Sequence, residues 1–472
     1  MKKKDEVGVL LDSGAQDWQV FQQDSTGTAD VKLRGRWITR EKFKAASVLV
    51  RIVFEDKGES VGSDFDWRKA TTRKDGTWYV TLKGLPSGGL YRIETVLQLD
   101  GAPPEWSQRG DIVHHVGVGD VWVIAGQSNA AGYGKAPALD PPELGVHMFH
   151  ACGEWKLATH PLGDSSGTCY PPNREGANAS HSPWLAFARG LKSRLGYPIG
   201  LIPAALGGSP ISSWDRHEDG TLFENMLRYI KDSGGGVKGM VWYQGESDAG
   251  EPQLSLYPDR FRRFVADLRR TLKDSAFPVI TAQLNRVVCG EISDEGNAGW
   301  EGMREAQRQL ARRLKNVFIV ATVDLGLSDG IHIDSPGNLV IGERMAAAAL
   351  GGVHGLDVKY LHPDCVRASL VSPTCIELEF VNVDDHLHYE SFVKSEFPFA
   401  VRDREGDVPL VGLQMAAANR CRLLLEREPG RSATVIGAPT SSPPRLIPYD
   451  QRGYRPMLGF TMKVNRGSRA SD

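Results

Sequence analysis

Three residues have the types and spacing needed for nucleophilic chemistry: Ser128, Asp329 and His332. Ser128 follows a short apolar run within Gly126-Gln127-Ser128-Asn129, and a serine at a strand-to-helix turn presents both its hydroxyl and its backbone N–H to one point. Asp329 stands three residues before His332, so its carboxylate can fix the imidazole tautomer and stabilise the imidazolium. The ordinary alternatives are an N-cap for Ser128, a turn cap for Asp329 and a surface position for His332.

Two further polar blocks also follow apolar runs, namely Leu206-Gly207-Gly208-Ser209 and Trp242-Tyr243-Gln244-Gly245-Glu246-Ser247. In the second block, Glu246 could bind substrate hydroxyls or serve as an acid, and a buried, hydrogen-bonded structural carboxylate is an equally good interpretation. Trp214 and Trp242 could stack on sugar rings beside a polar cleft, whereas core packing is the more common role of tryptophan.

These blocks need a scaffold that brings distant segments together, and the central part of the chain predicts one. Short apolar runs alternate there with amphipathic helices, which is the pattern of a parallel sheet covered on both faces. The predicted strands are 121–125, 199–204, 238–243, 278–284 and 317–323, and the predicted helices are 183–195, 257–272, 300–314 and 336–350. Because functional groups gather beyond the carboxyl ends of such strands, all four blocks should share one rim.

The period of the apolar pattern changes twice along the chain and divides it into three. Before residue 119 and after residue 352 the period is two, which indicates half-buried antiparallel strands. We therefore expect an α/β fold in which a flavodoxin-like parallel-sheet domain, 119–352, is flanked by two all-β, sandwich-like domains, 1–118 and 353–472. The segment 152–181 is long, polar and rich in Gly and Pro, and loops of this length are usually functional or mobile.

Composition argues against several classes of partner. The 472 residues carry 56 Lys+Arg against 58 Asp+Glu, a formal charge of −2, so the basic excess of a nucleic-acid binder is missing. No apolar run reaches the roughly 18 residues that a membrane span requires. We expect neither nucleic acid nor a membrane as partner, and the oligomeric state stays open.

The first residues resemble the positive region of a secretory signal, but the apolar stretch from Val7 to Leu11 contains Gly8 and stops at Asp12. It is too short for the apolar core of a signal peptide. A cytoplasmic location is the default expectation, and a secreted or periplasmic one applies if a signal was trimmed.

Cysteine and histidine spacing indicates no metal site. The six cysteines include no CxxC pair, and local bridges between Cys152 and Cys169 or between Cys365 and Cys375 remain open beside free thiols. His332-Ile333-Asp334 could offer metal ligands, but no second cluster accompanies it. We expect no metal ion and no other cofactor.

Taken together and in order, the four blocks resemble the SGNH hydrolase superfamily. They are Gly126-Gln127-Ser128-Asn129, Gly207-Gly208-Ser209, Trp242-Tyr243-Gln244-Gly245-Glu246-Ser247 and Asp329-x-x-His332. They are most similar to the branch that contains the sialate O-acetylesterases and acetylxylan esterases. The resemblance covers about half of the chain and is far more specific than any single block.

The resemblance implies a serine esterase that removes acetyl groups from sugar hydroxyls. It makes Ser128 the nucleophile, His332 the general base and Asp329 the carboxylate that orients it. The oxyanion hole would consist of the N–H groups of Ser128 and Gly208, with Gln244 as side-chain donor, although the sequence does not separate Gly208 from Gly207. Possible substrate-binding residues are Gln127, Asn129, Glu246 and Trp214.

The implied substrate is an acetylated oligo- or polysaccharide, either a hemicellulose such as xylan or an O-acetylated sialic acid. A lipase or thioesterase on the same fold is one alternative, but it would need an apolar acyl channel that the polar loops do not indicate. Another is a glycan-binding protein whose hydrolase-like core no longer reacts.

Overall fold

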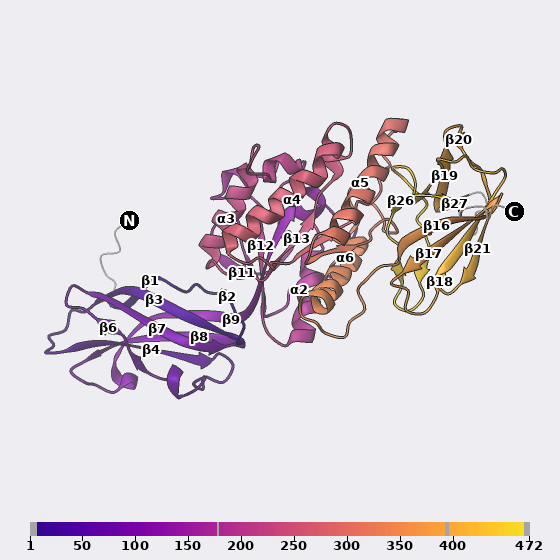
Figure 1. Ribbon diagram of the computed structural model, residues 1–472. Coiled ribbons are helices and arrows are strands. Elements are labelled where there is room, and N and C mark those ends of the chain that lie inside the picture. Colours follow the sequence, from indigo (N-terminus) through magenta and orange to yellow (C-terminus); the bar gives the residue numbers. More distant parts are fainter. Residues whose placement is uncertain (1–6, 177–178, 392–395, 467–472) are drawn as a thin grey trace.

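The computed structural model describes residues 7–176, 179–391 and 396–466 and has three parts in a row (Figure 1). A β part at the N-terminus is followed by a central part of mixed strands and helices and then by a second β part. The two β parts lie at opposite ends of the molecule. No helix in the described residues is both long and apolar enough to cross a membrane.

The N-terminal part consists of strands in two layers around one core. Its strands are β1 (Gly8–Ser13), β2 (Val20–Gln22), β3 (Thr28–Ile38), β4 (Ala46–Phe54), β5 (Arg68–Lys69), β6 (Thr71–Thr72), β7 (Thr77–Pro86), β8 (Gly88–Leu99) and β9 (Gln108–Gly126). In β3 buried and exposed residues alternate, so Val31 and Leu33 face the core while their neighbours face solvent. They pack there against Val50 and Ile52 of β4.

The central sheet contains every strand that the sequence predicts. In chain order these are β9, β12 (Ile199–Pro203), β13 (Gly239–Tyr243), β14 (Val279–Ala282) and β15 (Val317–Val320), and all pair in parallel in the spatial order 2-1-3-4-5. The sequence did not predict β10 (Val146–Phe149) and β11 (Trp155–Leu157), which extend the sheet beyond β12. The predicted α/β class is confirmed.

The helices agree with the predictions in place but not at every end. They are α1 (Ser128–Ala131), α2 (Trp184–Leu195), α3 (Thr221–Ser233), α4 (Gln253–Leu272), α5 (Asp294–Arg313) and α6 (Ser335–Ala348), which continues into a π-turn, Ala349–Val353. The sequence pattern missed α3, and α5 begins earlier than predicted because Ser293 caps it by accepting the N–H of Gly296. Helices α2 and α6 lie side by side, since Gly190 and Gly342 allow close contact between them (Figure 1).

Strand β9 belongs to two parts of the molecule at once. Its first half pairs antiparallel with β8, from Gln108 to Val118, and its second half pairs in parallel with β12 and β13, from Asp120 to Gly126. The expected domain boundary at residue 118 therefore falls within a continuous strand. This strand orients the N-terminal part relative to the central sheet.

The C-terminal part is again built of strands. They are β16 (Asp364–Ser372), β17 (Cys375–Val381), β18 (Leu387–His388), β19 (Phe399–Asp403), β20 (Gly406–Asp407), β21 (Leu410–Ala417), β22 (Arg420–Leu425), β23 (Thr434–Gly437), β24 (Tyr449–Asp450), β25 (Arg455–Pro456), β26 (Phe460–Lys463) and β27 (Asn465–Arg466). All six cysteines are free. Cys365 lies opposite Phe380 and Cys375 opposite Ser372, so these two cysteines stand at opposite ends of one strand pair, beyond disulfide reach.

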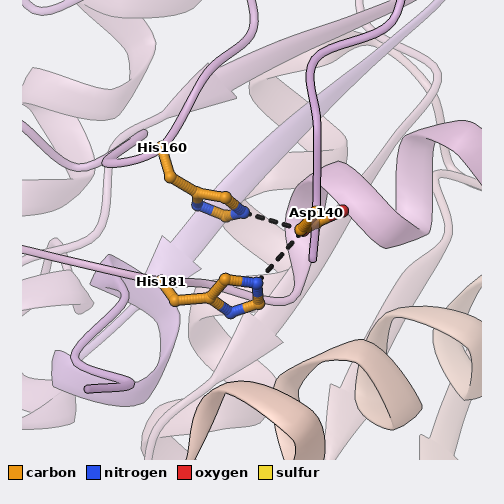
Figure 2. Close-up of side chains that lie close together, drawn as sticks. All are labelled: Asp140, His160 and His181. Carbon is orange, nitrogen blue, oxygen red and sulfur yellow. Dashed lines mark hydrogen bonds and ion pairs between the residues drawn. The ribbon is translucent and has the colours of Figure 1, made fainter. Parts of the chain in front are cut away.

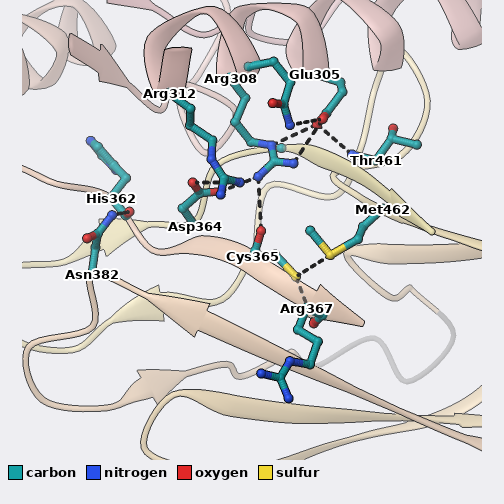
Figure 3. A network of polar contacts seen from close by, with 12 residues as sticks. Glu305, Arg308, Arg312, His362, Asp364, Cys365, Arg367, Asn382, Thr461 and Met462 are labelled. Atoms are coloured by element: carbon teal, nitrogen blue, oxygen red, sulfur yellow. Dashed lines mark hydrogen bonds and ion pairs between the residues drawn. The ribbon is translucent and has the colours of Figure 1, made fainter. Parts of the chain in front are cut away.

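Helix α5 lies at the contact between the central and C-terminal parts (Figure 3). The Arg308 side chain is 1% exposed and donates to Asp364 Oδ1 at 2.6 Å and to the carbonyl of Cys365 at 3.1 Å. It also pairs with Glu305, whose carboxylate accepts the N–H of Thr461 at 3.0 Å. One buried guanidinium thus balances carboxylates from both parts.

We expect Arg308→Met to destabilise the protein by about 3 kcal/mol, because removing one member of a buried ion-pair network leaves its partners uncompensated. Arg312→Met is the matched control, since Arg312 is 40% exposed and lies 3.6 Å from the same Asp364; its cost should stay below about 1 kcal/mol. Urea unfolding followed by tryptophan fluorescence measures both. Equal effects of the two changes would contradict the importance assigned to Arg308.

Candidate active site

The four polar blocks meet where the parallel strands end, and the closest approach is at Gly126. Gly126 has a φ of 125°, and a Cβ there would lie 2.1 Å from the carbonyl oxygen of Tyr243, so only glycine fits. Next to it, the N–H of Gln127 donates to Tyr243 O at 2.9 Å and the N–H of Leu206 donates to Gly126 O at 3.0 Å. The first three blocks are therefore joined through their backbones.

Ser128 opens the short helix α1 directly after this junction and is 9% exposed. The carbonyl of Gln127 accepts the N–H groups of Ala130 and Ala131, both at 2.8 Å, which fixes the turn. The N–H of Ser128 belongs to the first helical turn, where backbone donors have no partner within the helix. The hydroxyl and N–H of Ser128 thus come from one tightly fixed turn.

Asp329 and His332 form the pair that their spacing predicts. Asp329 Oδ2 lies 2.8 Å from His332 Nδ1, while Asp329 Oδ1 accepts the N–H groups of Ile331 at 3.0 Å and His332 at 2.8 Å. Partial burial by itself would raise the pKa of Asp329, but the hydrogen bonds from His332 and the backbone outweigh it and hold that pKa well below its usual range. The ring of Tyr133 stacks on His332 at a centroid distance of 4.9 Å.

Asn129 connects the histidine loop to the other blocks. Its Nδ2 donates to Glu246 Oε1 at 2.7 Å, and its Oδ1 accepts the N–H of Ile333 at 3.0 Å. This amide brings the neighbours of Ser128 and His332 into contact, although the described residues show no direct hydrogen bond between Ser128 Oγ and the imidazole. Such bonds are often long without substrate and shorten when it binds. Asn129 was expected to bind substrate, and here it positions the site.

The structure distinguishes the two glycines of the second block. The N–H of Gly207 is taken by Glu175 Oε2 at 2.8 Å. Gly208 has a φ of 69°, and within the described ranges no acceptor is found for its N–H. Of these two glycines, and among the described residues, only Gly208 has a backbone N–H without an acceptor, so this N–H can bind a ligand.

The side chains of Gln244 and Gln127 are hydrogen-bonded to each other in a buried position. Gln244 is fully buried, and its Nε2 lies 2.5 Å from Asp248 Oδ2 and 3.3 Å from Gln127 Oε1. Gln127 Oε1 also accepts the N–H of Ser247 at 3.2 Å. The amide nitrogen of Gln244 is thus engaged away from solvent, which disagrees with its expected role as oxyanion donor, and Gln127 holds the third block in place.

Trp214 is not at the surface of the site. Its ring is fully buried, packs edge-on against Trp242 at a centroid distance of 5.2 Å, and donates its Nε1–H to Ser209 Oγ at 3.2 Å. The interpretation of Trp214 as a sugar-stacking residue is therefore wrong. Trp242 is equally buried, so both rings belong to the core beneath the rim.

Two residues of the rim escaped the sequence interpretation, Tyr133 and Glu175. The hydroxyl of Tyr133 is hydrogen-bonded to Glu175, whose carboxylate also accepts from Gly207. Beside Glu175 lies a cavity of about 610 Å³, lined mostly by polar residues of the long loop, among them Asp164, Ser165 and Arg174. The only sequence signal was the length and polarity of the segment 152–181.

The carboxyl group of Glu246 is removed from water without a full set of hydrogen bonds. Its Oε1 accepts from Asn129, whereas Oε2 is buried and has no hydrogen-bond partner among the described residues. Burial raises the pKa of Glu246, and the hydrogen bond from Asn129 only partly opposes this effect.

Because this pKa is raised by folding, ionisation of Glu246 costs stability as the pH rises through its folded value. The Glu246→Gln variant keeps the acceptor for Asn129. We expect its melting temperature to equal that of the wild type below about pH 4, where Glu246 is protonated in both the folded and the unfolded protein. It should exceed the wild type in melting temperature by a margin that grows toward neutral pH. The exposed Glu251→Gln is the control, and a margin independent of pH would show that packing rather than ionisation is responsible.

Comparison with known proteins agrees with this geometry. Residues 118–351 match the family described as carbohydrate esterase, sialic acid-specific acetylesterase. A probable carbohydrate esterase of Arabidopsis thaliana is 29% identical over 254 residues, which is 49% of this chain and 90% of that protein. The human sialate O-acetylesterase is 24% identical over 315 residues, and the match spans 56% of this chain and 58% of the human protein.

A solved structure resembles the whole chain. The carbohydrate acetylesterase from Xanthomonas citri superposes with a TM-score of 0.67, covering 96% of this chain and 99% of that one at 22% identity. At this identity the likeness establishes the fold, including both β parts, and nothing finer. Together the comparisons confirm the resemblance to the SGNH hydrolases of the sialate O-acetylesterase branch. Residues 118–351 match the carbohydrate esterase family of sialic acid-specific acetylesterases, and the chain is an esterase hydrolase.

Proposed function

We propose that the protein is a serine carbohydrate O-acetylesterase that removes acetyl groups from sugar hydroxyls through an acetyl-enzyme. The observation that carries the proposal is the Asp329–His332 pair at 2.8 Å, fixed to the block of Ser128 by the bond from Ile333 N–H to Asn129. The proposed architecture is an SGNH-type domain, 119–352, between two sandwich-like domains, 1–118 and 353–472. Because Ser128, His332 and Asp329 are all present, an enzyme is favoured over a glycan-binding protein with an inactive core.

In the proposed mechanism Ser128 Oγ attacks the acetyl carbonyl while His332 Nε2 takes the proton. Asp329 holds Nδ1–H, so the tautomer with a free Nε2 lone pair is selected and the imidazolium is stabilised as it forms. His332 then protonates the sugar oxygen as the C–O bond breaks, which leaves acetyl on Ser128. Water repeats the sequence with His332 as base and releases acetate. No cofactor takes part.

The developing oxyanion would be held by the N–H groups of Ser128 and Gly208. The free N–H of Gly208 and the occupied N–H of Gly207 support this choice. Gln244 could contribute only if its amide turned away from Asp248. Each donor aimed at the oxyanion is worth about 3 kcal/mol in the transition state.

The cavity of about 610 Å³ beside Glu175 is the proposed sugar subsite. Its lining of carboxylates, hydroxyls and one guanidinium suits a ring of hydroxyl groups and does not suit an alkyl chain. This disfavours a lipase or thioesterase. Between the two proposed substrates, the carboxylates of Asp164 and Glu175 outnumber the cation of Arg174, so an uncharged sugar such as acetylated xylose is favoured over sialic acid.

We expect Ser128→Ala to lower kcat for 4-nitrophenyl acetate by about 10³-fold or more while the circular dichroism spectrum stays unchanged. The wild type should prefer acetate over butyrate and octanoate. Ser193→Ala, an exposed serine on α2, is the control and should retain full activity. Substantial activity in Ser128→Ala would refute the nucleophile, and a preference for octanoate would favour the lipase.

The negative charge of the proposed sugar subsite leads to a separate prediction about which acetylated sugar the protein prefers. The wild type should hydrolyse an acetylated xylo-oligosaccharide with a kcat/KM about tenfold above that for O-acetylated sialic acid. Asp164→Asn should narrow this gap by improving the sialic acid ester, because it removes a carboxylate that repels the sugar acid. Asp259→Asn, on the exposed face of α4, controls for net charge. A clear preference for sialic acid would overturn the choice of an uncharged substrate.

A further inference from the structure

Asp140, His160 and His181 come from three separate segments and meet at one point (Figure 2). Asp140 Oδ2 lies 2.8 Å from His160 Nε2 and 3.2 Å from His181 Nε2. The side chains of all three are largely buried, with Asp140 only 1% exposed. Their positions in the sequence have no metal-ligand spacing, so the cluster was not foreseen.

The orientation of His181 points to a ligand. This residue is 8% exposed, and neither of its ring nitrogens has a hydrogen-bond partner in the described part of the chain, although Nε2 is close to the Asp140 carboxylate. His181 Nε2 therefore contacts the carboxylate without a hydrogen bond of ordinary geometry. The three potential ligand atoms lie within 4.8 Å of one another, close enough to bind one cation together.

The surrounding contacts hold the three side chains in place. Arg189 pairs with Asp140 Oδ1, which leaves Oδ2 for the histidines. The backbone of His181 exchanges two hydrogen bonds of 3.1 Å with Gly134, and its carbonyl accepts from Asn338 at 3.0 Å. The rings of His160 and His181 stack at a centroid distance of 4.2 Å. Such support is typical of a preformed ligand set.

We propose that Asp140, His160 and His181 bind one zinc ion. Two imidazole nitrogens and one carboxylate oxygen are a donor set that suits Zn²⁺, with water as the fourth ligand. The opposing interpretation is a proton shared between the carboxylate and the two imidazoles, and the experiment below separates the two. No step of the proposed acyl transfer uses these three residues.

The consequence of zinc binding concerns the long loop. His160 and His181 stand at the two ends of segment 161–180, which includes Asp164, Ser165 and Glu175 and lines the proposed sugar subsite. A metal that joins both ends closes this loop and removes much of its conformational freedom. Zinc would thus act as a structural clip for one wall of the site.

A second group of possible ligands provides the control. Asp215, His217 and Asp267 also lie within 4.8 Å of one another, but this group offers one imidazole instead of two, and the side chain of His217 is 57% exposed. This group should bind zinc weakly or not at all.

The test is a calorimetric titration of the EDTA-treated, dialysed full-length protein with ZnCl₂ at neutral pH. We expect one ion per chain, with an affinity that falls at least about 100-fold in His160→Gln and in His181→Gln and is unchanged in His217→Gln. Absence of binding by the wild type would overturn the proposal and favour the shared proton. Undiminished binding by both histidine variants, or loss only in His217→Gln, would also overturn it.

A measurement on the wild type guards against variants that fail to fold. Co²⁺ added to the metal-free protein should give the intense visible absorption of a four-coordinate ion with nitrogen ligands, and Zn²⁺ should abolish it. The weak spectrum of hydrated Co²⁺ would contradict the site. Segment 161–180 should become more resistant to trypsin, which can cut at Arg174, when zinc is added, and equal cleavage with and without zinc would refute the clip.

Discussion

The arrangement of the site depends on the backbone contact between Gly126 at the end of β9 and Tyr243 at the end of β13. A Cβ at Gly126 would collide with Tyr243, and the positive φ of Gly126 turns the chain out of the sheet just before Ser128. The neighbouring bond from Leu206 N–H brings the end of β12 into the same junction. Because the strand order 2-1-3-4-5 reverses its direction between β9 and β13, the site lies at the switch point of the sheet, as in other open α/β sheets.

Side-chain oxygens that accept backbone N–H groups hold the loops around this junction. Gln127 accepts from Ser247, Asn129 from Ile333, Asp248 from Ile211, and Glu175 from Gly207. Loops that meet at a rim lack the regular ladder of a sheet, and their buried donors still need partners. Many polar residues of the motifs therefore serve the backbone rather than a substrate. The groups left for the proposed chemistry are Ser128, Asp329, His332 and the N–H of Gly208.

Most of the central fold could be predicted from the sequence because buried parallel strands and amphipathic helices leave periodic patterns. All predicted strands and helices are present, whereas α3 and the edge strands β10 and β11 were missed. Strands β10 and β11 are short and lie within a stretch of Gly, Pro and polar residues. The pairing of β10 with β12, and of β11 with β10, therefore decides their conformation rather than the local pattern. The boundary predicted at residue 118 is the point where β9 changes its pairing partners, but the sequence pattern did not show that one continuous strand crosses it.

The site was predictable to the extent that its contacts are local. Asp329 and His332 are three residues apart, and this spacing alone allows the observed pair. Gln244 and Trp214 stand in equally suggestive motifs, but their surroundings come from distant segments, which bury both, and no local pattern reports such burial. The cluster of Asp140, His160 and His181 was missed for the same reason. These residues are far apart in the sequence, and only the fold brings them together. Residues whose role depends on long-range neighbours therefore need the structure, and the loop 152–181, which contributes both Glu175 and His160, is where sequence patterns say least about the function.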